Sequence, residues 1–328
     1  MKRLPLNVQT LYADLAQGVT FSSVLPGSIF THKVHGKTYL YTTERHGSKR
    51  VKRYLGPAKH ADVLNKASEI RRAAEDAKLR RTTVSMLKRL GVPAPPLAMG
   101  RVMEAVANAG LFRKGIVLVG TGAYQTYSPA VGVALSAAVL ITQDADLAAA
   151  SLSIVSDFEN DNMLQILRRA DPSFVPQPGL DLRDLPKRFR SAAGLEVDVI
   201  TRYRSRADEE RAVVIPGLAC SAQPFRYIEY LITDPMPIVA LYGSGVQVLV
   251  PQPARYAVHK LIVAQIRSES SAKRVKDLAQ AKELIQALNL TDVRAIEDAL
   301  FDARRRGAKW TTHIDRSLQE IHLESHPQ

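Results

Sequence analysis

The sequence predicts a mixed α/β protein, of the α/β or α+β class, with three regions along its 328 residues. Strand-like and helix-like segments alternate from about residue 100 to about residue 250, which is typical of helices packed on a mixed sheet. A β-hairpin and a long helix precede this core, and a run of helices follows it. We therefore divide the chain into a basic N-terminal region (1–95), a central core (96–250) and a C-terminal helical region (251–328).

A small antiparallel sheet is predicted in the N-terminal region. Residues 30–42 alternate in polarity around Gly36, as a β-hairpin does, and residues 49–55 form a third strand. Residues 58–89 have the pattern of a long helix, which the proline-rich segment 91–96 stops. The sequence leaves two arrangements open for the tyrosines of the hairpin: they pack onto the core, or they stay exposed and clamp nucleic acid.

Positive charge is concentrated in the same region. Residues 1–100 contain 18 Lys and Arg against 6 Asp and Glu, a net +12, and the other 228 residues contain 27 against 26. A basic region beside a near-neutral core suits a protein in which one part binds RNA or another nucleic acid and the other part catalyses a reaction. Solvated helix faces account for the same charge equally well.

Composition excludes several classes of protein. With 46% hydrophobic residues, the chain can bury an ample core. The single Cys220 excludes an intramolecular disulfide and is expected to be a buried apolar residue, which favours a cytoplasmic location. The longest apolar stretch, residues 129–141, is too short to span a bilayer, and no signal-peptide core is present, so no membrane role is expected. The eight histidines lack the spacing of zinc ligands.

The central core carries acids in strand-like segments. Asp144 and Asp146 stand one residue apart, about twenty residues after the apolar segment 115–119, and alternate residues of a strand share one face. A later alternating segment puts Glu196 and Asp198 on one face of a second strand. Carboxylates a few ångströms apart repel each other unless a cation compensates them, and Mg²⁺ prefers oxygen ligands. A solvated or locally hydrogen-bonded pair is the alternative explanation for the first motif.

The turn before the first acidic pair contains two glycines. Gly120, Thr121 and Gly122 follow the apolar segment directly, and such a turn can bring backbone N–H groups close to a polyphosphate. A plain turn that closes a buried strand is the alternative. The order of the motifs, first the glycine turn and then the acids, indicates phosphoryl transfer.

The C-terminal region is predicted to be helical. Pro253 starts a helix that reaches Arg267, a second helix holds residues 273–285, and a third begins with Thr291 as its cap and ends near Gly307. An exposed helix face explains the lysines of these helices, but an ammonium can also offset the charge of a leaving pyrophosphate. The candidate triphosphate contacts are Lys260, Lys273 and Lys276.

These motifs resemble those of the polymerase-beta-type nucleotidyltransferase superfamily. The resemblance rests on Gly120-Thr121 followed by a helix, on Asp144-x-Asp146 and on the later strand acid Asp198. Within the superfamily, the chain is similar to a bacterial family of proteins described only as nucleotidyltransferase-fold proteins. The likeness covers most of the chain and includes residues 119–124, 142–147, 250–253, 259–261 and 273–281.

The resemblance implies a polymerase-beta-like fold and a reaction that moves a nucleoside monophosphate from a nucleoside triphosphate to an acceptor hydroxyl. Two Mg²⁺ ions take part in this reaction. Asp144 and Asp146 would hold both ions, while Asp198 would bind one of them and accept the proton of the acceptor. The residues expected at the nucleotide are Gly120, Thr121, Tyr124, Lys260, Lys273 and Lys276.

Two other functions remain compatible with the sequence. One is a catalytically inactive nucleic-acid-binding module of the same fold, and the other is a metal-dependent nuclease that uses the same acids. The nucleotide, the acceptor (RNA, DNA, protein or small molecule) and a role for Glu196 as a metal ligand all stay open.

Overall fold

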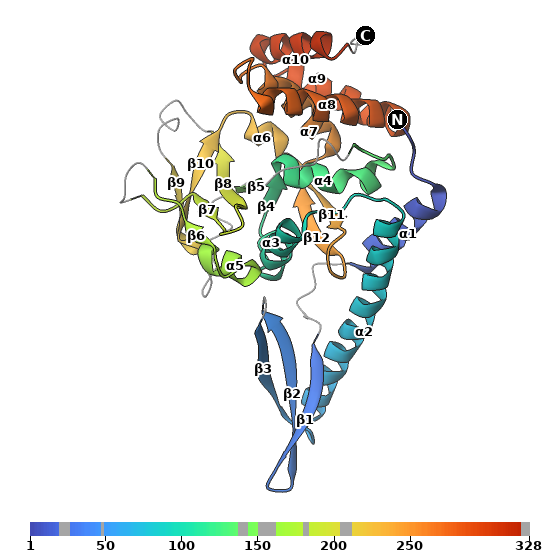
Figure 1. The fold of residues 1–328 in the computed structure, drawn as a ribbon, viewed down its shortest axis with the longest axis vertical. Coiled ribbons are helices and arrows are strands. Elements are labelled where there is room, and N and C mark those ends of the chain that lie inside the picture. The colour runs from blue at the N-terminus through green and yellow to red at the C-terminus, as the bar shows by residue number, and fades with distance from the viewer. Residues whose placement is uncertain are drawn as a thin grey trace.

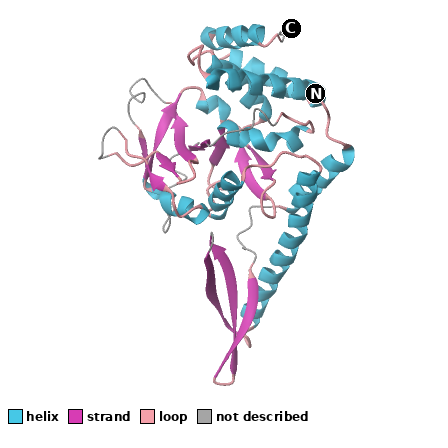
Figure 2. Ribbon diagram, in the orientation of Figure 1, coloured by secondary structure: helices cyan, strands magenta, loops and turns pink. Residues whose placement is uncertain are grey.

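The computed structural model describes residues 1–19, 27–46, 49–136, 144–149, 162–179, 184–203 and 212–322. They form a rounded body from which a three-stranded sheet and a long helix project as an arm (Figure 1). Most of the body combines helices and strands, whereas its C-terminal end consists of helices alone (Figure 2). The predicted mixed α/β class is confirmed.

The main sheet of the body is mixed. Its strands lie in the order β4-β5-β8-β10-β9, and the short pair β6–β7 lies along β8. β4 runs antiparallel to β5, whereas β5, β8 and β10 run parallel to one another. The strands are β4 (Ile116–Val119), β5 (Asp144–Ala149), β6 (Val175–Pro176), β7 (Arg188–Arg190), β8 (Glu196–Arg202), β9 (Val213–Ile215) and β10 (Cys220–Phe225).

Helices and a second hairpin enclose this sheet. Every residue of β4 is buried, and α4 begins directly after it, as the apolar segment and its glycine turn predict. The hairpin of β11 (Met236–Ala240) and β12 (Val246–Val250) lies beside β4 and α3. The helices of the core are α3 (Leu97–Asn108), α4 (Gly120–Val131), α5 (Met163–Ala170) and the short α6 (Ile228–Leu231), with a 3₁₀ turn at Pro216–Leu218.

The arm confirms the predicted hairpin, third strand and long helix. It consists of β1 (Ser28–Val34), β2 (Lys37–His46), β3 (Lys49–Pro57) and α2 (Ala61–Arg89). The strands are antiparallel, and the β1–β2 turn has positive φ angles at His35 (47°) and Gly36 (75°), as a tight primed turn requires. Leu40 packs against Val63 and Ala67, so α2 covers one face of the sheet.

A helix that the sequence analysis did not predict fixes the arm to the body. α1 (Leu6–Gly18) packs with the C-terminal end of α2 and with β11, in a cluster that contains Leu15, Leu87 and Val239. The Tyr12 hydroxyl adds a hydrogen bond to the carbonyl oxygen of Val239, at 3.1 Å.

The C-terminal region contains α7 (Pro253–Ala264), α8 (Ala272–Thr291), α9 (Val293–Arg304) and α10 (Ala308–Glu320). Pro253 lies in the first turn of α7, as predicted. The predicted cap at Thr291 is wrong, because Thr291 is the last residue of α8 and its hydroxyl donates to the Ala287 carbonyl at 2.9 Å. The cap of α9 is Asp292, whose carboxylate accepts from the Ala295 amide.

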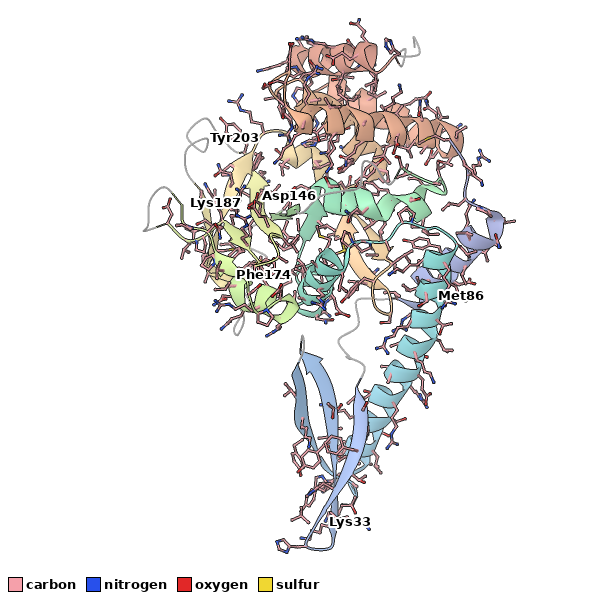
Figure 3. All side chains as sticks on the ribbon, viewed as in Figure 1. Lys33, Met86, Asp146, Phe174, Lys187 and Tyr203 are labelled. Atoms are coloured by element: carbon pink, nitrogen blue, oxygen red, sulfur yellow. The ribbon has the colours of Figure 1, made fainter. Side chains whose placement is uncertain are left out.

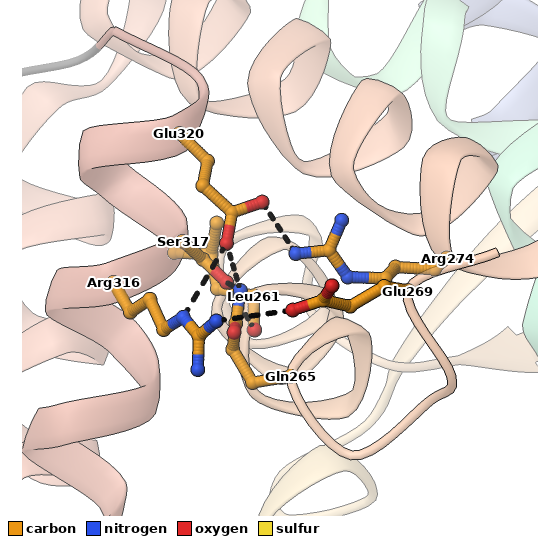
Figure 4. Close-up of polar contacts among 7 residues, drawn as sticks. All are labelled: Leu261, Gln265, Glu269, Arg274, Arg316, Ser317 and Glu320. Atoms are coloured by element: carbon orange, nitrogen blue, oxygen red, sulfur yellow. Dashed lines mark hydrogen bonds and ion pairs between the residues drawn. The ribbon is translucent and has the colours of Figure 1, made fainter. Parts of the chain in front are cut away.

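Polar contacts join α10 to α7 and α8 (Figure 4). The Gln265 amide donates to the Ser317 hydroxyl at 2.8 Å and to Glu320 at 2.9 Å, and Arg274 pairs with Glu320 at 2.5 Å. The Ser317 hydroxyl in turn donates to the Leu261 carbonyl at 2.7 Å. Burial raises the pKa of Glu320, but the hydrogen bonds from Gln265 and Arg274 outweigh burial and hold that pKa below its ordinary value.

Cys220 is buried in β10, as expected for a packing residue, and burial raises the pKa of its thiol to about 12. None of the helices in the described ranges combines the length and the apolar character that a bilayer crossing needs.

Candidate active site

Two rows of residues cross β5, β8 and β7. In one row Asp146 is the register partner of Asp198, and Asp198 is the partner of Arg188 on its other side. The neighbouring row consists of Asp144, Glu196 and Arg190. Register partners on adjacent strands lie about 4.8 Å apart in the hydrogen-bonding direction and share a face of the sheet. The fold therefore brings acids from two distant segments onto one face.

Arg188 neutralises Asp198 in the structure. Its Nε lies 2.6 Å from Oδ1 of Asp198 and its Nη2 lies 2.7 Å from Oδ2, which is the forked geometry of a strong charge-assisted pair. Arg188 and Arg190 also lie 3.7 Å from the carboxylate of Glu196. Arg188 was not among the predicted site residues, although the alternation of Arg188 and Arg190 about the buried Phe189 is a strand signal.

Gly120 is the point where the glycine turn meets the acids. Its φ is +61°, and a Cβ at this position would lie 2.2 Å from Oδ2 of Asp146. The backbone conformation therefore favours glycine, and a side chain at this position would displace the carboxylate of Asp146. Since α4 begins at Gly120, the N–H groups of its first turn, which have no partner within the helix, and the positive end of its dipole lie beside Asp146.

The C-terminal helices hold this turn in place. The Tyr256 hydroxyl on α7 lies 2.9 Å from the carbonyl oxygen of Gly120 and 2.9 Å from Oε1 of Gln280 on α8. Burial raises the pKa of Tyr256, and negative charge nearby, including that of Asp146, raises it further. The hydroxyl therefore stays protonated and can donate to the turn.

Tyr124 is buried on α4, next to the glycine turn. Its hydroxyl donates to Glu283 at 2.5 Å, and burial together with Glu283 raises its pKa. Its ring packs with those of Tyr127 and Tyr256, at centroid distances of 6.4 and 6.0 Å. Contact of Tyr124 with a nucleotide stays a prediction, and its partners in the structure are protein groups.

The three predicted lysines lie on α7 and α8. Lys260 is buried and pairs with Asp277 at 2.5 Å, and Arg267 pairs with the other oxygen of Asp277 at 2.6 Å. Burial raises the pKa of Asp277, but the two cations outweigh it and hold the pKa below its ordinary value. Lys273 is exposed and Lys276 is half-buried on α8. Their contact with a nucleotide, like that of Lys260, stays a prediction.

The donor set fits a divalent cation in its chemistry. Asp146 and Asp198 offer carboxylate oxygens on one face, and Gly120 leaves the space beside Asp146 free of a side chain. No group of three His, Cys, Asp or Glu residues whose side chains the structure describes is arranged to hold a metal ion, and for Asp144 the structure describes the backbone alone. Because Arg188 contacts both oxygens of Asp198, a cation bound by Asp198 would compete with Arg188 for the charge of that carboxylate.

Comparison with known proteins matches the chain to a protein family. A protein-family model described as "Nucleotidyltransferase" matches residues 98–304, from α3 to the end of α9. No curated protein matches the chain, and no solved structure does. The match contains the glycine turn, both acidic strands and the helices that carry Tyr256 and Lys260.

Proposed function

The chain belongs to this nucleotidyltransferase family, and from that premise we propose that it moves a nucleoside monophosphate from a nucleoside triphosphate to an acceptor hydroxyl, with two Mg²⁺ ions. Nucleotidyl transfer in general follows from the family. The dependence on magnesium, an acceptor made of RNA and a cytoplasmic setting are the finer parts of the proposal.

One observation carries the proposal: Asp198 is the register partner of Asp146, which lies against the glycine turn. Asp144 and Asp146 would hold both ions, and Asp198 would hold one. Bound magnesium would compensate the charge of the triphosphate and lower the pKa of the acceptor hydroxyl. Asp198 would accept the proton that this hydroxyl loses.

The other residues of the site would position the triphosphate. The backbone N–H groups at Gly120 and Thr121, at the start of α4, are suited to phosphate oxygens. Arg188 would exchange Asp198 for a phosphate, since its planar fork matches both groups. Lys260, Lys273 and Lys276 are the further candidates for phosphate contacts, and Tyr124 is the candidate beside the turn.

The direct test is incubation of the protein with total RNA, MgCl₂ and each α-labelled nucleoside triphosphate in turn. We expect one nucleotide to be incorporated without shortening of the RNA. Strand shortening without incorporation would favour a nuclease that uses the same acids. Salt-sensitive binding that survives both Asp144→Ala and Asp146→Ala, with no turnover by any form, would favour an inactive nucleic-acid-binding module.

A further inference from the structure

The sheet of the arm has one covered face and one open face. Helix α2 packs on the face that contains Leu40, and the opposite face carries aromatic rings. We call this open face the aromatic face and define it by Phe30, His32, Tyr39, Tyr41, Tyr54, Lys37 and Lys52. These residues share a face because Phe30 pairs with Tyr41 across β1–β2 and Tyr41 pairs with Tyr54 across β2–β3.

The rings of the aromatic face form a continuous row. Phe30 stacks on Tyr41 with centroids 5.5 Å apart and planes at 17°, and Tyr41 meets Tyr54 at 5.3 Å. Tyr39 lies 6.1 Å from Tyr54 on the other side. Tyr54 is 52% exposed, and Phe30, Tyr39 and Tyr41 are half-buried. Two neighbouring side chains of the same sheet also meet the rings: His32 lies edge-on to Tyr41, and Lys52 lies over Phe30. A partly exposed row of large rings on one face of a sheet is a candidate binding surface.

The charge of the sheet identifies the class of ligand. The three strands contain seven Lys and Arg residues and a single acid, Glu44. The Lys52 ammonium lies 5.5 Å from the centroid of Phe30, so positive charge and aromatic rings alternate on the surface. A ligand that fits both the rings and the cations has flat aromatic faces and an anionic backbone. Nucleic acid meets that description, and only an unpaired strand exposes its bases for stacking.

The place of the arm indicates a polymer. Lys33 lies at the tip of the arm and Asp146 lies within the body (Figure 3). Helix α2, which runs along the arm, has 29 residues and so extends over about 43 Å at 1.5 Å per residue. An acceptor that contacts both the aromatic face and the acids has to reach from the arm to the body, which suits a polymer.

We propose that the aromatic face is a stacking platform for single-stranded nucleic acid. The inference deepens the proposed function, because it names the acceptor as an unpaired strand. Bases would stack on the rings of Phe30, Tyr41 and Tyr54, while Lys37 and Lys52 would contact the phosphates.

The test is fluorescence anisotropy with the full chain and labelled oligonucleotides of roughly 20 nucleotides, longer than the 4–16 nucleotides that single-strand-binding folds cover. RNA, DNA and duplex forms are compared without any nucleoside triphosphate. We expect single strands to bind at least about tenfold more tightly than duplexes. We also expect Tyr54→Ala to weaken binding about tenfold, because one base then loses the ring on which it stacks. Tyr54→Phe keeps the ring and should keep the affinity.

Phe301→Ala is the matched control, since Phe301 on α9 is 50% exposed and lies outside the arm. Circular dichroism of each variant checks the fold, and ultraviolet cross-linking of the unmodified protein to oligo(U) maps the contact directly. Adducts on residues 28–57 support the inference. Adducts confined to the body, equal affinity for duplexes, or unchanged affinity of a folded Tyr54→Ala variant would overturn it. Asp146→Asn should bind the strand normally, so failure of binding and failure of nucleotidyl transfer are separate results.

Discussion

The guanidinium of Arg188 forms a forked pair with the carboxylate of Asp198, with N–O distances of 2.6 and 2.7 Å. On its other side, Asp198 is the register partner of Asp146. The same carboxylate thus lies between a cation of the chain and the acid next to the glycine turn. Arg188 and a metal ion compete for the same oxygens, so we expect the arginine to set the affinity of the acids for cations.

Arg188→Ala should therefore tighten binding of Mn²⁺, used as a spectroscopic substitute for Mg²⁺. An exposed pair is commonly worth about 0.2–1 kcal/mol, so the dissociation constant should fall by a factor of about 1.4 to 5. Electron paramagnetic resonance of free Mn²⁺ measures it without any reaction. Arg190→Ala is the control, because Arg190 approaches Glu196 only to 3.7 Å. An unchanged or weaker affinity of Arg188→Ala for Mn²⁺ would contradict the competition.

Tyr256→Phe tests whether the C-terminal helices hold the glycine turn. Loss of the hydroxyl removes its contacts with Gly120 and Gln280, which should lower stability by about 1 kcal/mol. We expect the rate of transfer to fall about tenfold, because small displacements of positioning groups slow a reaction strongly. Tyr127→Phe is the matched control: its hydroxyl donates to the Pro251 carbonyl at 2.8 Å and should affect stability alone. If the two variants are equally active, the Tyr256 hydroxyl does not position the glycine turn for the reaction.

Lys260→Met separates a structural role of Lys260 from contact with the triphosphate. Removing one partner of a buried pair typically costs about 3–5 kcal/mol, and Arg267 remains to offset part of that loss. We expect Lys260→Met to lower the free energy of unfolding in urea by about 2–3 kcal/mol. The double variant Lys260→Met/Asp277→Leu should recover most of this loss, because it removes both charges of the pair. Lys273→Ala, at an exposed position, should leave stability unchanged and weaken nucleotide binding. A Lys260→Met variant of normal stability but weak nucleotide binding would assign Lys260 to the triphosphate.

His259 makes stability depend on pH. Burial, with a further effect of Lys260, lowers the pKa of His259 to about 3 from 6.5, and neither ring nitrogen has a hydrogen-bond partner in the described ranges. As the pH falls below 6.5, His259 takes up a proton in the unfolded chain. In the folded protein it stays neutral until about pH 3. Stability should therefore fall on acidification through this window, by up to about 1.4 kcal/mol per pH unit.

His259→Leu should remove this part of the pH dependence. Its melting temperature should change less than that of the unmodified protein between pH 6.5 and about pH 5.5, a window that lies above the range where most carboxylates titrate. If the melting temperatures of the two proteins change equally with pH across this range, His259 does not cause the pH dependence of stability.

Local patterns made part of the fold predictable. The hairpin about Gly36, the helix that ends before the prolines and the alternation around Asp198 each depend on neighbours in sequence. Helix α1 was missed although Val8, Tyr12 and Leu15 form a buried stripe, because the helix is short and its apolar face is completed by distant residues such as Val239.

Long-range pairing limited the prediction of the site. Strand alternation predicted that the acids share a face, but the register of β5 against β8 and the contact of Arg188 with Asp198 depend on how separate segments pair. The pattern of a helix face likewise gave no sign that Lys260 is buried against Asp277, which lies on another helix. Buried partners of this kind emerge only when the chain is packed.

The most direct measurement compares incorporation of labelled nucleotide by the unmodified protein and by Asp146→Asn, with Asp14→Asn on the exposed surface of α1 as control. The two-ion arrangement predicts that Asp146→Asn keeps its melting temperature and loses activity by several orders of magnitude, because one carboxylate ligand is neutralised. The control should retain full activity. Incorporation by a folded Asp146→Asn variant at the rate of the unmodified protein would contradict the assignment of these acids to nucleotidyl transfer.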